Sequence, residues 1–234
     1  MKILHISDTH LHPLEPILDG YEADVLVHSG DGLNSGSESE GYKFLKDWKA
    51  ATSRFKYKIY IPGNHCKHYG KYPTMWKDEF AQDGSIYLDM SGKEIEGVYF
   101  WGHTMIPPIN GHWYGEREEH ERRRGLSFIP NHEKLVLISH GPPYMIMDSI
   151  IKEPVWGGMP YFSPNWGCPA LREFLYDRTV PVLACLSGHI HNGRLDGPTY
   201  EMETKNGKTI ISNASICDES YEPIFKPVMI ELEV

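Results

Sequence analysis

The chain has 234 residues, a mass of 26.8 kDa and a formal net charge of −9 at pH 7. Its hydrophobic content of 40% is ordinary for a globular protein and allows a sizeable core. An acidic chain lacks the clustered Lys and Arg that hold nucleic-acid phosphates, which argues against extended nucleic acid as a partner.

The cysteines and the N-terminal segment indicate a cellular compartment. The four cysteines lie far apart and form no CxxC pair: Cys66, Cys168, Cys185 and Cys217. This spacing fits neither a zinc ribbon nor a disulfide-stapled secreted module. The chain reaches Asp8 before an apolar signal segment could form, and no run is long enough to span a bilayer. We therefore predict a cytoplasmic protein without a membrane partner, in which the thiols are reduced.

Five short apolar segments, typical of buried strands, each end at a side chain that can bind a metal. In chain order they are KILHIS before Asp8, DVLVHSG before Asp31, YKIYIPG before Asn64 and His65, KLVLIS before His140, and VLACLSG before His189. Functional groups gather at the carboxyl ends of parallel strands, and all five of these positions are such ends.

Helical patterns separate the strands. Ser37 and Glu40 form the pattern of a capping box, and the apolar residues that follow fall on one helical face: Leu45, Trp48 and Ala51. Pro169 suits a first helical turn, which is followed by a second apolar stripe: Leu171, Phe174 and Leu175. Alternating strands and helices predict a largely parallel α/β arrangement.

The last third of the chain has a different pattern. Segments 199–204, 208–213 and 227–234 alternate polar and apolar residues and are separated by Gly or Pro. They predict a second, more antiparallel sheet packed on the first. Because the chain contains neither a linker nor an internal repeat, we expect a single domain over residues 1–234.

Two irregular stretches, 104–114 and 141–169, are expected to be binding loops. The second follows His140 and should form a rim of the site. Aromatic residues in or near these loops either stack on a nucleobase or pack the rim: Trp113, Tyr144, Trp156, Tyr161 and Trp166. We expect His5 and His28 to lie in the core and His12 and His103 near the site.

The run GEREEHERRRG, residues 115–125, is either an anion clamp or a solvated helix face. The pairs Glu118–Arg122 and Glu119–Arg123 are spaced four residues apart, which favours the solvated face.

Seven residues together make a candidate metal site: Asp8, His10, Asp31, Asn64, His140, His189 and His191. Two divalent cations need about eight to ten hard or borderline donors, with a carboxylate able to bridge them. The pairs Asp8–His10 and His189–His191 each place two donors on one side of an extended segment. Donors without thiolate favour manganese, iron, zinc or magnesium.

The ordered motifs DTH, GD, GNH, SHGPP and GHIH resemble those of the calcineurin-like metallophosphoesterase superfamily over nearly the whole chain. SHGPP, GCPALREFL, SGHIHNG and SNAS further resemble the small metallophosphoesterase-domain-containing (brain-type) proteins, which are similar to phosphodiesterases that act on cyclic nucleotides. The resemblance implies a four-layer α/β/β/α sandwich of two mixed sheets flanked by helices.

It also implies roles for the candidate residues. One metal would be held by Asp8, His10, Asp31 and His191. The other would be held by Asp31, Asn64, His140 and His189, with the Asp31 carboxylate bridging. A hydroxide shared by the two metals, manganese in the first instance, would attack phosphorus, and His65 would protonate the leaving oxygen as general acid.

Two positions depart from the family pattern. Many relatives carry acidic residues where this chain has Asn34 and Cys66. Both changes remove a negative charge near His65, so we expect an acid-shifted pH optimum, which a Cys66→Glu variant would alter.

The resulting hypothesis is a dinuclear metal-dependent phosphodiesterase that hydrolyses a small phosphoester, with cyclic nucleotides among the candidates. The alternatives are a nuclease acting on DNA or RNA, a phosphomonoesterase or protein phosphatase, and an inactive scaffold. The sequence GDGLN lacks the acid and the Arg of the protein phosphatases, and a scaffold would be expected to lose ligands. The sequence indicates no oligomeric state.

Overall fold

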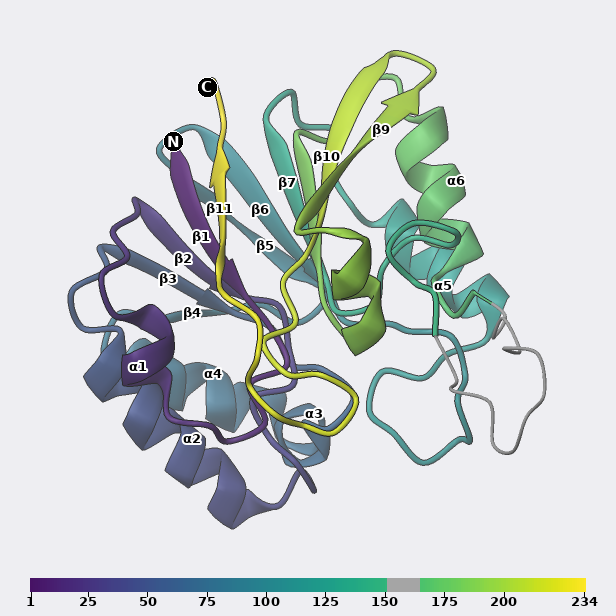
Figure 1. Ribbon diagram of the computed structural model, residues 1–234. Helices are drawn as coiled ribbons and strands as arrows, with labels where there is room; N and C mark the ends of the chain where they lie inside the picture. The colour runs from purple at the N-terminus through teal and green to yellow at the C-terminus, as the bar shows by residue number, and fades with distance from the viewer. Residues whose placement is uncertain (151–164) are drawn as a thin grey trace.

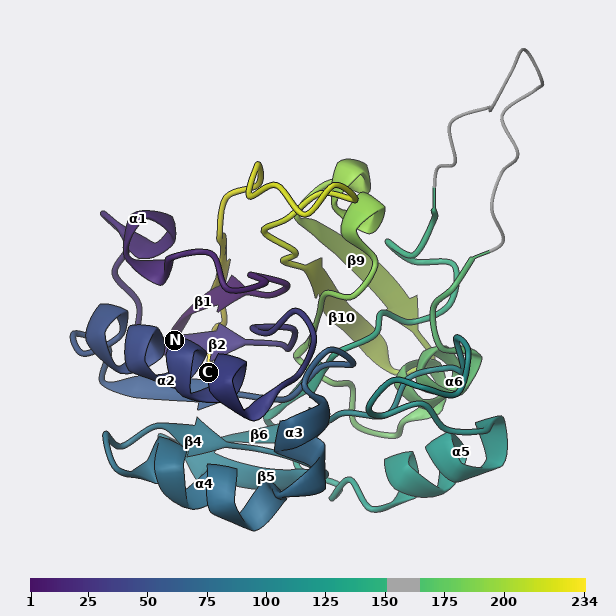
Figure 2. The same ribbon diagram turned by 90° about the horizontal axis from the view of Figure 1, so that it is seen from below.

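Two β-sheets pack face to face, with helices on both outer surfaces, in the computed structural model, which describes residues 1–150 and 165–234 (Figure 1). Viewed from below, α1, α2 and α4 lie on one side of the molecule and α5 and α6 on the other (Figure 2). This is the four-layer α/β/β/α sandwich that was predicted. None of the helices in the described ranges combines the length and the apolar character needed to cross a membrane.

The first sheet has the strand order β11-β1-β2-β3-β4. Its strands are β1 (Lys2–Ile6), β2 (Val25–His28), β3 (Tyr57–Tyr60), β4 (Ile86–Tyr87) and β11 (Val228–Glu231). All neighbours are parallel except β11, which runs antiparallel to β1. On its outer surface lie α1 (Leu14–Leu18), α2 (Glu38–Ala51), α3 (Lys67–Lys71) and α4 (Pro73–Ala81).

The second sheet has the order β5-β6-β7-β8-β10-β9. Its strands are β5 (Ser91–Ile95), β6 (Val98–His103), β7 (Leu135–Ser139), β8 (Ala184–Ser187), β9 (Thr199–Thr204) and β10 (Gly207–Asn213). The four inner strands are parallel and the two edge strands antiparallel. Helices α5 (Glu119–Ser127) and α6 (Pro169–Asp177) cover the outer face, and a 3₁₀ helix, η1 (His191–Asp196), follows β8.

Side-chain alternation along the strands creates the layers. Val25 and Val27 of β2 face the second sheet, whereas Leu26 faces the helices. The helical residues predicted to face inward on α2 are all buried. The two sheets therefore share one core, and helices on each outer face enclose another on either side.

The prediction for the last third of the chain was wrong in its pairing. Strands β9 and β10 extend the second sheet beside β8, whereas β11 returns to the first sheet beside β1. Alternation shows that a strand has one buried face but does not identify its neighbour. For the same reason, the five predicted strand ends come from two sheets: three from the first and two from the second.

The helix over residues 119–127 was predicted to be a solvated face, but one of its sides is buried. The predicted pair of Arg123 and Glu119 is present at 2.6 Å. Arg122 instead turns inward, is buried and donates to the carbonyl of Arg117 at 2.6 Å, while Glu118 caps the helix. The helix must bury one face against the sheet, and position 122 lies on that face.

Candidate metal centre

The seven predicted donors gather where the carboxyl ends of the two sheets meet. A backbone link joins the sheets here, because Ser7, after β1, pairs with Ser215, after β10. Six of the seven fall into two groups within which the candidate ligand atoms lie within 4.8 Å of one another. The groups are Asp8, His10 and His191, and Asp31, His140 and His189. Their convergence agrees with the sequence-based expectation, and their role as metal ligands stays a prediction.

In the first group, two ring nitrogens point at each other. The Nε2 atoms of His10 and His191 are 3.3 Å apart, and Asp8 Oδ1 lies 3.4 Å from His191 Nε2. Asp8 also accepts hydrogen bonds from the His189 backbone N–H and, at 2.9 Å, from the Ser215 hydroxyl. These bonds fix the orientation of the Asp8 carboxylate.

In the second group, Asp31 Oδ2 lies 3.1 Å from His140 Nε2. The amide oxygen of Asn64, the seventh predicted donor, lies 2.8 Å from the same nitrogen. Asp31 Oδ1 accepts the backbone N–H of His65 at 2.8 Å. The loop after β3 is therefore tied directly to the loop after β2.

Backbone carbonyls set the orientation of three of the histidines. The acceptors of their Nδ1–H groups are Leu33 O for His10, Ser29 O for His140 and Asp218 O for His191, at 3.0, 2.9 and 2.7 Å. A carbonyl can only accept, so each Nδ1 carries a hydrogen and the Nε2 lone pair of the neutral ring points into the cluster. This arrangement is typical of metal-binding histidines. Facing lone pairs at 3.3 Å need a positive charge between them, so the residues fit divalent cations.

The electrostatics of the cluster is dominated by buried carboxylates. Burial by itself would raise the pKa of Asp8, but the hydrogen bond and charge of His191 outweigh it and hold that pKa well below its usual value. Burial would likewise lower the pKa of His191 and of His140, yet their Asp partners raise both to about 9. Burial lowers the pKa of His10 to about 4.

Several donors occupy strained backbone. Asp8, His10, Asp31 and His189 have φ angles of 50°, 43°, 56° and 68°, in the left-handed region that L-residues rarely adopt. Such strain persists where surrounding bonds over-determine it, and it concentrates at functional sites. The loop after β3 lies so close to Asp31 that position 63 requires glycine. A Cβ on Gly63 would lie 2.3 Å from Asp31 Oδ1.

His65 lies beside the two groups. Its ring is 4.9 Å from the His10 ring and 4.4 Å from the Trp113 ring, between centroids, and its Nδ1–H donates to the carbonyl of Asn34. Trp113 thus lies at the rim of the site, in agreement with the sequence-based expectation. The carbonyl fixes the hydrogen on Nδ1, so the proton-accepting nitrogen of neutral His65 is Nε2.

The sequence reasoning missed Tyr221. Its ring lies 4.6 Å from His10, 5.5 Å from His191 and 6.1 Å from His65, between centroids, and it is 43% exposed. Tyr221 belongs to the segment between β10 and β11, and His12 Nε2, in the loop after β1, donates to its carbonyl at 2.8 Å. The available signal was KTIISN, a further apolar run that ends at the same edge.

His5, His28 and His103 are buried in the protein interior. His5 and His28 are fully buried, as predicted, and His5 bonds the hydroxyls of Ser212 and Ser29. His103 is also fully buried, and its ring nitrogens have no hydrogen-bond partner among the described residues.

Cys66 does not face the site. Its thiol is fully buried in the core beneath the first sheet, 3.2 Å from the Tyr60 hydroxyl. Burial raises the pKa of Cys66 to about 12. The expectation that this position influences His65 through its side chain therefore conflicts with the geometry, because the backbone after Asn64 turns the side chain inward.

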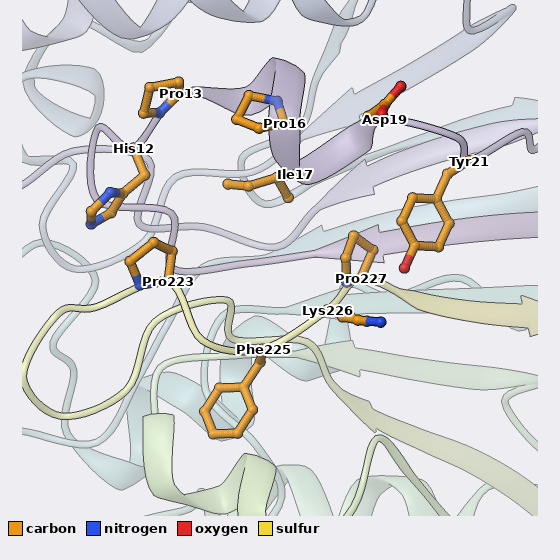
Figure 3. Close-up of a pocket in the computed structure, with 10 residues that line it drawn as sticks. All are labelled: His12, Pro13, Pro16, Ile17, Asp19, Tyr21, Pro223, Phe225, Lys226 and Pro227. Carbon is orange, nitrogen blue, oxygen red and sulfur yellow. The ribbon is translucent and has the colours of Figure 1, made fainter.

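A cavity of about 410 Å³ opens beside the Tyr221 loop (Figure 3). It lies between the α1 region and residues 223–227, with His12 and Pro223 at one end and Tyr21 and Pro227 at the other. None of the seven candidate donors lines it. Of the predicted rim, residues 141–150 and 165–169 are described; Trp156 and Tyr161 lie outside the described residues.

The chain is similar to known proteins in sequence and in fold. A family model described as calcineurin-like phosphoesterase matches residues 1–193. The UPF0046 protein K07C11.7 of Caenorhabditis elegans is 30% identical, over 98% of this chain and 74% of that protein. Human metallophosphoesterase domain-containing protein 1 is 28% identical, over 99% of this chain and 71% of that protein.

The crystal structure of TT1561 of Thermus thermophilus has the same fold, with a TM-score of 0.59 and 13% identity over 98% of this chain and 97% of that one. The site and fold thus define a class of metal-dependent phosphoester hydrolases. The chain belongs to the calcineurin-like phosphoesterase family.

Proposed function

We propose that this protein is a dinuclear metal-dependent phosphodiesterase that hydrolyses small phosphoesters, with cyclic nucleotides among the candidate substrates. The observation that carries the proposal is the pair of adjacent Asp and His groups with Nε2 lone pairs directed inward and His65 beside them. A small ester suits the acidic chain better than extended nucleic acid does.

The proposed ligands of the two cations are the seven residues that converge: Asp8, His10, Asp31, Asn64, His140, His189 and His191. Asp31 is the proposed bridge, since its carboxylate is close to His140 and also interacts electrostatically with His10. Two divalent cations would supply an activated water near neutral pH and neutralise charge on the phosphoryl oxygens. Oxygen and imidazole donors suit manganese, iron, zinc or magnesium, and we propose manganese first.

His65 is the proposed general acid. The Asn34 carbonyl occupies its Nδ1–H, so a proton held at Nε2 is the one available to the leaving oxygen. Trp113 against one side of the ring limits its rotation. Positioned proton transfer of this kind contributes about 10²–10⁴-fold to a rate.

The test is hydrolysis by purified protein supplied with Mn²⁺. The substrates are bis-p-nitrophenyl phosphate, p-nitrophenyl phosphate, cyclic AMP, cyclic GMP and single-stranded DNA. We expect turnover of diesters, its loss in Asp31→Asn, and a kcat lower by about 10²-fold or more in His65→Gln with the cyclic nucleotides, whose leaving oxygen needs a proton. His120→Gln, at an exposed position on α5, is the matched control.

Each alternative predicts a different result. Turnover of p-nitrophenyl phosphate alone would identify a phosphomonoesterase, and turnover of DNA alone a nuclease. Bound metal without turnover of any substrate would support an inactive scaffold and overturn the proposal.

A further inference from the structure

The Glu40 carboxylate, in the first turn of α2, binds a segment outside its own helix. Its Oε2 accepts the backbone N–H groups of Asn34, Ser35 and Gly36 at 3.2, 2.9 and 2.9 Å, and Oε1 accepts the Ser35 hydroxyl at 2.9 Å. The capping-box pattern predicted a return bond to the backbone of Ser37. Ser37 does cap the helix, accepting the Glu40 N–H, but the carboxylate holds residues 34–36 instead.

Segment 34–36 is in turn bonded to the loop that carries His65. The Asn34 carbonyl accepts the His65 Nδ1–H, and the Gly36 carbonyl accepts the His68 N–H at 3.1 Å. The contact is so close that a Cβ on Gly36 would lie 2.3 Å from the His65 carbonyl oxygen. The φ of Gly36 is also +76°, so this position requires glycine for two reasons.

These bonds form a continuous chain from Glu40 to the imidazole. Four donors converge on one carboxylate, which holds the three-residue segment in a single conformation. That conformation aims the Asn34 carbonyl at Nδ1 of His65. Without the carboxylate, three backbone N–H groups would lose their acceptor and the segment would have to rearrange.

We propose that Glu40 is a positioning residue for His65: through the 34–36 segment, it fixes the Nδ1–H tautomer and the orientation of the imidazole that faces the candidate metal centre. The effect of Glu40 on catalysis rests on the proposed general-acid role of His65. The effect of Glu40 on the tautomer of His65 does not depend on that role.

The first test observes the imidazole directly, in metal-free protein, by two-dimensional ¹H–¹⁵N NMR of the histidine rings, with the His65 signals assigned by their absence in His65→Gln. We expect the Nδ1–H tautomer of His65 in the wild type and a mixture with the Nε2–H tautomer in Glu40→Ala. Glu38→Ala removes a carboxylate from the same helical turn that has no bond to residues 34–36, and we expect it to leave His65 unchanged.

The second test uses the leaving group. A general acid matters for a poor leaving group and little for p-nitrophenolate, which departs without a proton. We expect Glu40→Ala to lower kcat by about 10-fold or more with diphenyl phosphate and by less than about 2-fold with bis-p-nitrophenyl phosphate, at unchanged KM. A purely structural role, or a role in metal affinity, would lower both rates equally.

Glu40→Gln retains one acceptor oxygen, so its tautomer ratio and rates should lie between those of the wild type and Glu40→Ala. It decides the question if the Ala variant does not fold. An unchanged His65 tautomer in the folded Glu40 variants, or equal loss with both esters, would overturn the inference. Failure of the wild type to hydrolyse any ester would overturn the proposed function only, because the NMR result would still stand.

Discussion

His10 and His191 face each other through their Nε2 atoms at 3.3 Å, although each ring already donates its Nδ1–H to a carbonyl. Two neutral rings in this arrangement would place lone pair against lone pair, so a positive charge is required between them. In the metal-free protein that charge is a proton, since the pKa of His191 is raised to about 9. A metal ion bound at this centre would therefore have to displace that proton.

Metal binding is expected to release protons. Below about pH 9, His140 and His191 are protonated in the metal-free protein because Asp31 and Asp8 stabilise their charges. A cation must displace these protons. Its affinity should therefore fall by up to about tenfold for each unit by which the pH is lowered and for each proton released. Titration calorimetry with Mn²⁺ in buffers of different ionisation enthalpy measures the number of protons released. An apparent enthalpy that is the same in all buffers would contradict this prediction.

Ser215 is expected to support metal binding through Asp8. Its hydroxyl donates to Asp8 Oδ2 at 2.9 Å. Loss of a partner of this kind typically lowers metal affinity about 10–100-fold. Ser215→Ala should therefore bind Mn²⁺ more weakly, as measured by calorimetry, and keep its fold. Ser127→Ala, at an exposed site on α5, serves as the control, and equal affinities in both variants would show that Asp8 does not need this bond.

Tyr221 is expected to contact the substrate. Its half-exposed ring lies against His10 and His191 in a backbone conformation with φ of 64°. Tyr221→Asn removes the ring, and Asn tolerates this conformation better than most residues. Loss of one aromatic contact should raise KM for diesters about 5-fold or more, with kcat changed less. Tyr200→Asn, at an exposed position on β9, should change neither constant.

Cys66→Glu is expected to unfold the protein more readily rather than to shift its pH optimum. The substitution would bury a carboxylate beside Tyr60 without a positively charged partner. The free energy of unfolding should fall by about 3 kcal/mol or more, as measured in urea. Cys66→Ala, which introduces no charge, should lose less stability. A stable Cys66→Glu protein with an altered pH profile would instead support the sequence-based expectation.

The metal-free protein is expected to be most stable near pH 6.5. Burial lowers the pKa of His5 and His28 to about 3, so the unfolded chain binds more protons and stability falls as the pH drops from 6.5 toward 3. The raised pKa values of His140 and His191 give stability that is complete below 6.5 and is lost as the pH rises to about 9.

Thermal unfolding from pH 4 to 10 in the presence of a chelator should show this maximum. The melting temperature should decline by several degrees on each side, given about 2–4 °C per kcal/mol for a chain of this size. Saturating Mn²⁺ should remove the decline on the alkaline side, because a bound cation replaces the two protons. A melting temperature that rises steadily to pH 9 in chelator would contradict the raised histidine pKa values.

The convergence of the candidate donors could be predicted from the sequence because five of the seven follow directly on an apolar run and the other two lie two residues further on. Asp8 and His140 each end a strand, and parallel strands present those ends at one edge. Local patterns also predicted the cap at Ser37 and the first turn at Pro169. These features depend on neighbours within a few residues, which a sequence displays.

The errors have the opposite origin. The strand β11 pairs with β1 across almost the whole length of the sequence, and Arg122 turns inward against a sheet that its own helix pattern does not reveal. The capping-box pattern at Glu40 was correct for the helix, but the carboxylate found better donors in a loop that precedes it. In each case, contacts that form only in the folded chain determined the structure, and local sequence patterns do not reveal such contacts.

The sequence by itself determined which donors this protein has and the order in which they occur, because the chemistry of a carboxylate, amide or imidazole belongs to the residue. Only the tertiary structure decided which nitrogen of His10, His65, His140 and His191 points into the centre and which carbonyl holds the other, and it brought Tyr221 beside the centre and Glu40 against the segment that bonds His65. The reason is physical: a tautomer is fixed by its hydrogen-bond partner, and the partners here are backbone carbonyls that folding brings from distant parts of the chain.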